Sequence, residues 1–124
     1  MTKANLNEIE INGVKYVPSG TELAMAQKVD GMEYVIVRAS NAGVFAGHLV
    51  RKIGNEVTLR NSRRLWYWDG ASSLSQLAME GTSKPENCKF PCPVVNETVI
   101  GVIEIISCTE KARQSIEGVE IWKS

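Results

Sequence analysis

The sequence contains a single histidine and three cysteines, so few of its side chains are suited to binding a metal. Cys88, Cys92 and Cys108 are odd in number and irregularly spaced, which is not the pattern of a disulfide framework. Together with His48 they could supply four zinc ligands, but the spacing matches no zinc module. The alternative interpretation is that they are reduced, partly buried thiols. We therefore expect no metal site.

Long apolar runs are also missing. No stretch approaches the roughly 18 residues needed to span a membrane. The first residues lack the apolar core of a secretory signal. We therefore expect the protein to stay in the cytosol and to bind no membrane.

Familiar catalytic motifs are absent from the sequence. It has no Gly-x-Ser-x-Gly elbow, no phosphate-binding glycine loop and no His-Glu-x-x-His pair. His48 lies between Gly47 and Leu49 in a predicted strand, where a hydrogen-bonded structural role is favoured and catalytic use is the alternative. We expect a binding protein that is not an enzyme and has no cofactor.

Excess charge of either sign is missing too, because 14 basic residues balance 14 acidic ones. A neutral chain does not hold a long nucleic acid by bulk electrostatics. Basic residues nevertheless gather between positions 51 and 64, where one acid, Glu56, is accompanied by Arg51, Lys52, Arg60, Arg63 and Arg64. This local patch favours a compact anion as the ligand.

The 124 residues are enough for one domain with its own core. Hydrophobic patterning predicts an α+β fold: an antiparallel β-meander with short helices, an N-terminal hairpin and a C-terminal strand-helix-strand. Residues 1–30 are expected to form the hairpin, turning at Asn12 and Gly13, and a short helix at 21–28. Residues 31–124 are expected to form the core sheet with two short helices. The expected core strands are 34–38, 44–51, 56–61, 64–68, 98–106 and 119–122.

Two features refine this prediction. The 98–106 strand is apolar nearly throughout, which places it at the centre of the sheet. Ser73 and Gln76 form a capping box that begins a helix ended by Gly81, and Thr109 caps a second helix over 110–117. The three prolines between 82 and 93 predict a loop there.

Residues 63–68, Arg-Arg-Leu-Trp-Tyr-Trp, are the most informative segment. On a strand, Trp66 and Trp68 would share one face. Indole faces stack on nucleobases and arginines bind phosphates, so a nucleotide site is one interpretation. The other is that the tryptophans belong to the core and the arginines to a solvated turn. Arg60 and Asn61 adjoin this segment and could add hydrogen bonds.

Two further candidates lie outside this segment. Phe90, in the proline loop, is either an exposed clamp for a planar ligand or an anchor inserted into the core. Arg113, in the last predicted helix, could reach a phosphate across a subunit boundary; the alternative is an ion pair with Glu110 three residues earlier.

Several runs of the sequence resemble one family over most of the chain from about residue 8. They are 34–38 (Tyr-Val-Ile-Val-Arg), 42–47 (Ala-Gly-Val-Phe-Ala-Gly), 63–71 (Arg-Arg-Leu-Trp-Tyr-Trp-Asp-Gly-Ala), 73–78 (Ser-Leu-Ser-Gln-Leu-Ala) and 108–113 (Cys-Thr-Glu-Lys-Ala-Arg). They look like the phage anti-Thoeris sponges. The resemblance implies a phage protein that acts in the bacterial cytoplasm, where it sequesters a cyclic ADP-ribose isomer without cleaving it.

The resemblance also implies homodimers or hexamers with pockets shared between two subunits, and cyclic trinucleotides at separate sites in some members. An aromatic residue and an asparagine would lie at the base of the pocket, and arginines at the phosphates. The matching candidates are Phe90, Trp66 or Trp68 for the aromatic, Asn96 or Asn61 for the asparagine, and Arg113 with Arg60 or Arg63 for the arginines.

Two other functions remain open from the sequence. One is a phage accessory protein that inhibits a host protein through the surface around Trp66 and Trp68. The other is an accessory domain of a nuclease or phosphodiesterase.

Overall fold

The structure is a computed structural model that describes residues 9–11, 14–16 and 24–123. Strands β1 (Ile9–Ile11) and β2 (Val14–Tyr16) pair antiparallel, with Ile9 opposite Tyr16, so the predicted hairpin pairing is confirmed. The turn at residues 12 and 13 lies outside the described part of the chain, as do residues 21–23 of the expected N-terminal helix.

The prediction of a helix is wrong for its described part, residues 24–28, which form no helix. Met25 forms a bridge with Thr109, and the Ala26 amide donates to the Cys108 carbonyl at 3.0 Å. The main-chain groups that a helix would use internally are thus bound to a distant segment. Tertiary pairing has overridden the helical propensity of these residues.

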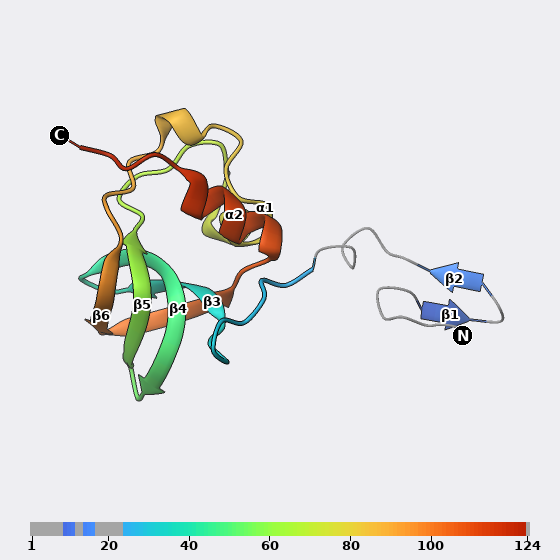
Figure 1. The fold of residues 1–124 in the computed structure, drawn as a ribbon, viewed down its shortest axis with the longest axis horizontal. Coiled ribbons are helices and arrows are strands. Elements are labelled where there is room, and N and C mark those ends of the chain that lie inside the picture. Colours follow the sequence, from blue (N-terminus) through green and yellow to red (C-terminus); the bar gives the residue numbers. More distant parts are fainter. Residues whose placement is uncertain (1–8, 12–13, 17–23, 124) are drawn as a thin grey trace.

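The core of the protein is a five-stranded antiparallel sheet flanked by two short helices, which confirms the α+β class (Figure 1). The strand order is β6-β5-β4-β3-β7. Within this sheet the first four strands along the chain, β3 to β6, form a meander, and β7 returns to pair with β3. The bounds are β3 (Tyr34–Ala39), β4 (Gly43–Ile53), β5 (Glu56–Arg64), β6 (Val94–Ile100) and β7 (Val102–Ser107).

The predicted central strand 98–106 is therefore wrong, because Gly101 divides it into the two edge strands. Gly101 has φ +83°, a conformation that L side chains rarely adopt. Its amide donates to the Asn55 carbonyl at 3.1 Å, and its carbonyl accepts from the Ser40 amide at 3.0 Å. A one-residue connection between opposite edges requires a strongly curved sheet, and Figure 1 shows β4 bending through it.

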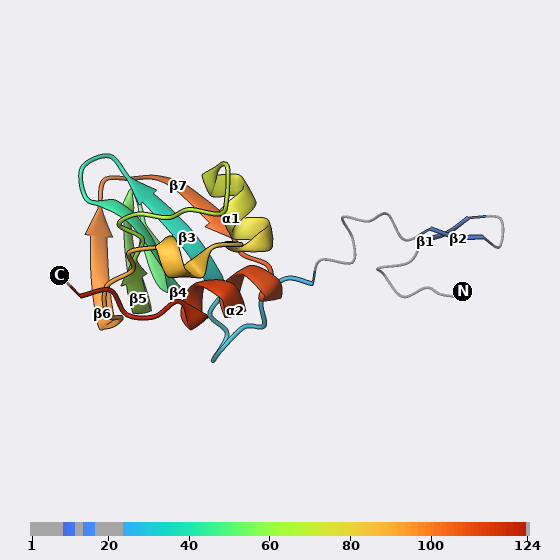
Figure 2. The same cartoon turned by 90° about the horizontal axis from the view of Figure 1, so that it is seen from above.

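Both helices begin at the predicted caps. Ser73 accepts a hydrogen bond from the Gln76 amide ahead of α1 (Leu74–Glu80), and Thr109 accepts from the Ala112 amide ahead of α2 (Glu110–Gly118). The two helices lie side by side on one side of the sheet (Figure 2). They bury one cluster that includes Leu77 and Ile116, while a second cluster fills the other face of the sheet. Both faces of β3 are consequently buried.

The strands expected at 64–68 and 119–122 are reduced to single bridges. After Arg64 the chain leaves the sheet, and Tyr67 pairs with Lys89 of the proline loop. Ile121 forms one parallel bridge with Phe90. The proline loop holds a short 3-10 turn, η2 (Pro85–Asn87), and takes both bridges. It therefore links the end of β5 to the segment after α2.

Candidate ligand pocket

A small pocket with mainly polar lining residues lies where the start of β3, the end of β5, the proline loop and α2 meet. Its volume is about 240 Å³. We call it the polar pocket; it is lined by Tyr34, Asn61, Arg63, Pro93 and Glu117. These residues come from four parts of the chain, namely β3, β5, the proline loop and α2. The sequence prediction had singled out two of them, Asn61 and Arg63.

Arg63 is the structural centre of this junction, because it is only 4% exposed and its guanidinium is bound by main-chain carbonyls. Nε donates to Pro91 O at 3.1 Å and Nη2 to Phe90 O at 3.1 Å. Nη1 donates to Ile116 O at 2.9 Å and to Glu117 O at 3.4 Å. Arg63 thus ties the proline loop to the end of α2. Of its five N–H groups, one on Nη2 has no hydrogen-bond partner among the described residues.

Asn61 enters the pocket from an irregularity in β5. It has φ +52°, a left-handed conformation that asparagine tolerates better than most residues. The register of β4 against β5 shifts at the same place, next to Gly47. A Cβ on Gly47 would lie 3.1 Å from Arg60 O and from Ser62 Cα, so the backbones of β4 and β5 approach closely at Gly47.

The buried polar atoms without a hydrogen-bond partner among the described residues are His48 Nε2 and Ser62 Oγ. His48 is 6% exposed, and its ring packs edge-on against Tyr34, with the ring centroids 5.1 Å apart. Burial lowers the pKa of His48, so the imidazole is neutral at pH 7. Burial, with a contribution from Glu117, raises the pKa of Tyr34 far above its usual range. His48 is not itself a lining residue of the pocket and adjoins it only through its contact with Tyr34.

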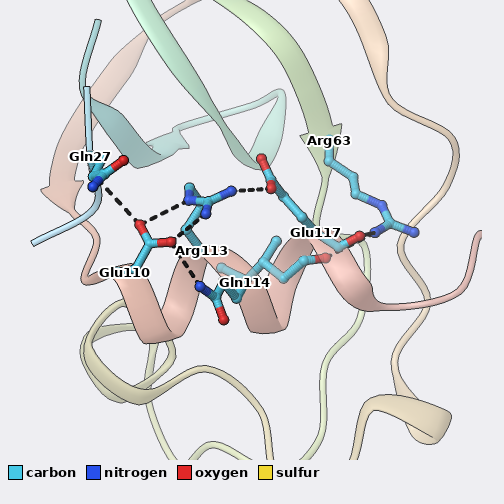
Figure 3. Close-up of polar contacts among 7 residues, drawn as sticks. Gln27, Arg63, Glu110, Arg113, Gln114 and Glu117 are labelled. Atoms are coloured by element: carbon cyan, nitrogen blue, oxygen red, sulfur yellow. Dashed lines mark hydrogen bonds and ion pairs between the residues drawn. The ribbon is translucent and has the colours of Figure 1, made fainter. Parts of the chain in front are cut away.

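Glu117, a lining residue of the pocket, belongs to a charged cluster on α2 (Figure 3). Arg113 forms ion pairs with both Glu110 and Glu117. Glu110 also accepts from the Gln114 side chain at 2.9 Å and from the Gln27 amide at 3.3 Å. The ion-pair interpretation of Arg113 is confirmed. Its charge is shared by two carboxylates of the same helix, so a phosphate would have to compete with them.

This cluster gives a testable dependence on pH. Hydrogen bonds from Arg113 and Gln114 lower the pKa of Glu110 to about 2. A carboxyl group whose pKa is lowered by folding stabilises the protein above its unfolded pKa, and this contribution is lost as the pH falls toward 2. We expect Glu110→Gln to lower the melting temperature at pH 7, and the difference from the wild type to vanish near pH 2.

Melting curves recorded between pH 7 and pH 2 measure this difference. The matched control is Glu120→Gln, which removes an exposed carboxylate outside the cluster and should leave the melting temperature close to the wild type throughout. If Glu110→Gln still melted below the wild type by the same amount at pH 2, the charge of the Glu110 carboxylate would not be the cause of the difference.

The two predicted tryptophans lie away from the polar pocket. Trp66 is 59% exposed and stacks on Trp122, with centroids 5.4 Å apart and planes 2° from parallel. Lys89 Nζ lies 5.3 Å from the Trp66 ring centroid. Trp68 is half-buried against the helix-side core. The expectation that both tryptophans share one strand face is wrong, because the chain has left the sheet at this point.

The remaining predicted residues are dispersed. Phe90 is fully buried, so the interpretation as an exposed clamp is wrong and the interpretation as a core anchor is confirmed. The Arg63 guanidinium lies 5.6 Å from the centroid of the Phe90 ring. Arg60 and Asn96 are exposed and face each other across β5 and β6. Sequence reasoning did not find Tyr34, Pro93 or Glu117, and for His48 it favoured a structural role, with catalytic use as the alternative. No local motif marks these residues, and only the strand register brings Tyr34 opposite His48.

The cysteines are free, with Cys88 and Cys108 buried and Cys92 exposed. Among the described residues, no group of three or more histidine, cysteine or acidic side chains is placed to hold a metal. In the same part of the chain, no helix has the length and hydropathy to cross a membrane.

These features define a small α+β protein in which a curved five-stranded sheet and a proline loop enclose a polar pocket. Residues 32–116 match a family described as a domain of unknown function, DUF6948, and the chain belongs to this family. The match covers the whole sheet, α1 and most of α2, but not Glu117 or Trp122. No curated protein and no solved structure matches the chain significantly.

Proposed function

We propose that this protein binds a cyclic nucleotide signal, such as a cyclic ADP-ribose isomer, in the polar pocket and sequesters it without cleaving it. The observation that carries the proposal is that two almost fully buried polar side chains, Arg63 and Tyr34, line one pocket together with Asn61 and Glu117. One N–H on Arg63 Nη2 has no hydrogen-bond partner among the described residues. Burying such groups is unfavourable unless they are hydrogen-bonded. A ligand that carries both donors and acceptors would supply the missing partners.

The identity of the ligand rests on the resemblance to the anti-Thoeris sponges together with the chemistry of the pocket. Tyr34, Asn61 and the remaining N–H of Arg63 can bind acceptors, and Glu117 can bind a donor. A nucleotide presents both kinds of group. The cellular setting proposed with this function is the cytoplasm of the bacterial host.

The size of the pocket limits how much of the ligand it holds. At about 240 Å³ it is smaller than the roughly 300–1,000 Å³ of complete small-molecule sites. It would therefore enclose one part of a cyclic dinucleotide-like ligand and leave the rest outside. A second copy of the chain, in a homodimer or a hexamer, is proposed to cover that remainder.

Sequestration without cleavage is consistent with the protonation of the pocket residues. Tyr34 is neutral at pH 7 and far from ionising. The Glu117 carboxylate is held in an ion pair by Arg113, which already occupies part of its hydrogen-bonding capacity. These groups are therefore suited to hydrogen bonding and poorly suited to proton transfer.

Isothermal titration with cyclic ADP-ribose isomers and cyclic oligonucleotides tests the proposal. We expect saturable binding at micromolar or lower concentrations, with intact ligand recovered by mass spectrometry after the complex is denatured. Recovery of a cleaved product would identify an enzyme. If none of these nucleotides binds, inhibition of a host protein becomes the better hypothesis.

The two candidate asparagines can be separated by mutation. Asn61→Gly removes the amide from the pocket and keeps the backbone, because glycine adopts φ +52° without strain. Loss of one ligand hydrogen bond, about 1–1.5 kcal/mol, should weaken binding roughly tenfold. Asn96→Ala is the matched control and should leave the affinity unchanged, since Asn96 does not line the pocket. If Asn96→Ala weakened binding and Asn61→Gly did not, the ligand site would lie on the outer surface of β6 and not in the polar pocket.

A further inference from the structure

A second region with the character of a binding surface surrounds the stacked pair Trp66–Trp122. On one side, a recess of about 370 Å³ is lined by Trp66, Trp68, Arg64 and the turn at residues 42–44; the Arg64 guanidinium donates to Ala42 O and lies 4.5 Å from the Phe45 ring centroid. On the other, Trp122 lines a groove of about 680 Å³ together with Pro85 and Ile121. Each hollow is lined by one indole of the stacked pair, and we call this pair the ridge.

The ridge and its surroundings are unusually exposed for apolar groups. Trp66 is 59% exposed, Tyr67 48% and Ile121 48%. Large apolar side chains that cluster on a surface commonly mark a site of protein interaction. The Lys89 ammonium lies over both stacked rings, 5.3 Å from the centroid of Trp66 and 5.7 Å from that of Trp122. The positive charge of Lys89 therefore interacts with the indole rings of the protein itself.

The charge of the groove selects among possible ligands. Glu86, Glu120 and Lys123 are its charged lining residues, which leaves one negative charge in excess among the described residues of the wall. A polyanion such as single-stranded nucleic acid would meet these carboxylates, although it could stack on the indoles. A basic side chain would be attracted to them.

We propose that this surface binds a proline-rich segment of a partner protein in the polyproline II conformation, with a basic residue of that segment between Glu86 and Glu120. Such segments dock into aromatic-lined slots, and they lose little conformational entropy because they are extended before binding. The recess and the groove provide two slots, each lined by one indole of the ridge. Proline rings would pack against Trp68 in one slot and against Trp122 in the other.

This surface and the polar pocket have no lining residue in common. The proposal therefore does not depend on nucleotide binding, and the two can fail separately. An Asn61→Gly variant should retain peptide binding, and a variant of Trp122 should retain nucleotide binding.

The test is fluorescence polarisation of the full chain with labelled Pro-x-x-Pro peptides that carry arginine, glutamate or no charge at one end. We expect saturable binding at micromolar concentrations, strongest for the arginine peptides and weakest for the glutamate peptides. Trp122→Ala should weaken binding by at least about tenfold, since truncated aromatic anchors cause the largest losses at interfaces. Glu86→Gln combined with Glu120→Gln should remove the preference for arginine.

Val95→Ala is the matched control, because Val95 is an exposed apolar residue on β6 outside both hollows and its loss should not change peptide affinity. Melting curves establish that Trp122→Ala is folded, and Trp66→Ala provides a second variant on the exposed ridge. The proposal is overturned if no peptide binds, if the glutamate peptides bind best, or if both tryptophan variants bind normally. Binding of a single-stranded oligonucleotide in place of the peptides would also overturn it.

Discussion

Replacing Arg63 by methionine is expected to lower the free energy of unfolding by about 3–5 kcal/mol. The guanidinium is buried and donates to the carbonyls of Phe90, Pro91, Ile116 and Glu117. Methionine keeps much of the side-chain volume but donates no hydrogen bond. Each buried carbonyl left without a partner costs about 1–3 kcal/mol unless water reaches it. Urea denaturation followed by far-ultraviolet circular dichroism measures the loss.

Arg60→Met is the matched control for this prediction. Arg60 lies in the same strand three residues earlier, but it is exposed. Its replacement should change the free energy of unfolding by about 0.5 kcal/mol or less. Similar losses in the two variants would show that the hydrogen bonds of Arg63 do not hold the proline loop and α2 together.

The contrast between these neighbouring arginines shows where sequence reasoning succeeds and where it stops. Strands β3, β4 and β5 and both helices were predictable, because turn residues and helix caps act over a few positions. Ser73 and Thr109 are examples, since each caps a helix through an amide three residues away. Arg60 and Arg63 look alike in the sequence, and only the long-range contacts of Arg63 make it a structural residue.

The mistaken elements share a physical cause. Gly101 interrupts an apolar run for which hydrophobic periodicity alone predicts one strand. The interruption comes from the positive φ of Gly101, which the flanking residues do not predict. Tyr67 and Met25 pair with distant segments in place of forming regular elements. Such pairings depend on what the rest of the chain presents to them.

The polar pocket was predictable only in part for the same reason. Asn61 and Arg63 belong to the basic segment that charge patterning identifies. Tyr34 and Glu117 lie far from it in the sequence and reach it through strand register and the position of α2. An ordinary tyrosine at the start of a strand and an ordinary glutamate at the end of a helix carry no local mark of a site.

Truncation of Phe90 is the second change with a large expected effect. The side chain is fully buried in the helix-side core, where it anchors the proline loop, while the loop carbonyls of Phe90 and Pro91 accept hydrogen bonds from Arg63. Phe90→Ala should lower the free energy of unfolding by about 3–5 kcal/mol, because it removes apolar contacts and leaves a cavity. Phe90→Leu, which retains much of the volume, should cost no more than about 1.5 kcal/mol. Chemical denaturation of the two variants measures both values.

The same pair of variants decides between an anchor and a ligand clamp at this position. An exposed clamp would lose nucleotide affinity in both variants and would change stability by about 0.5 kcal/mol or less. For an anchor, Phe90→Leu should keep both its fold and its nucleotide affinity, because the loop carbonyls still accept from Arg63 and the pocket wall at Pro93 stays in place. Loss of nucleotide binding in a stably folded Phe90→Leu protein would therefore contradict the anchor role, since volume alone would not explain it.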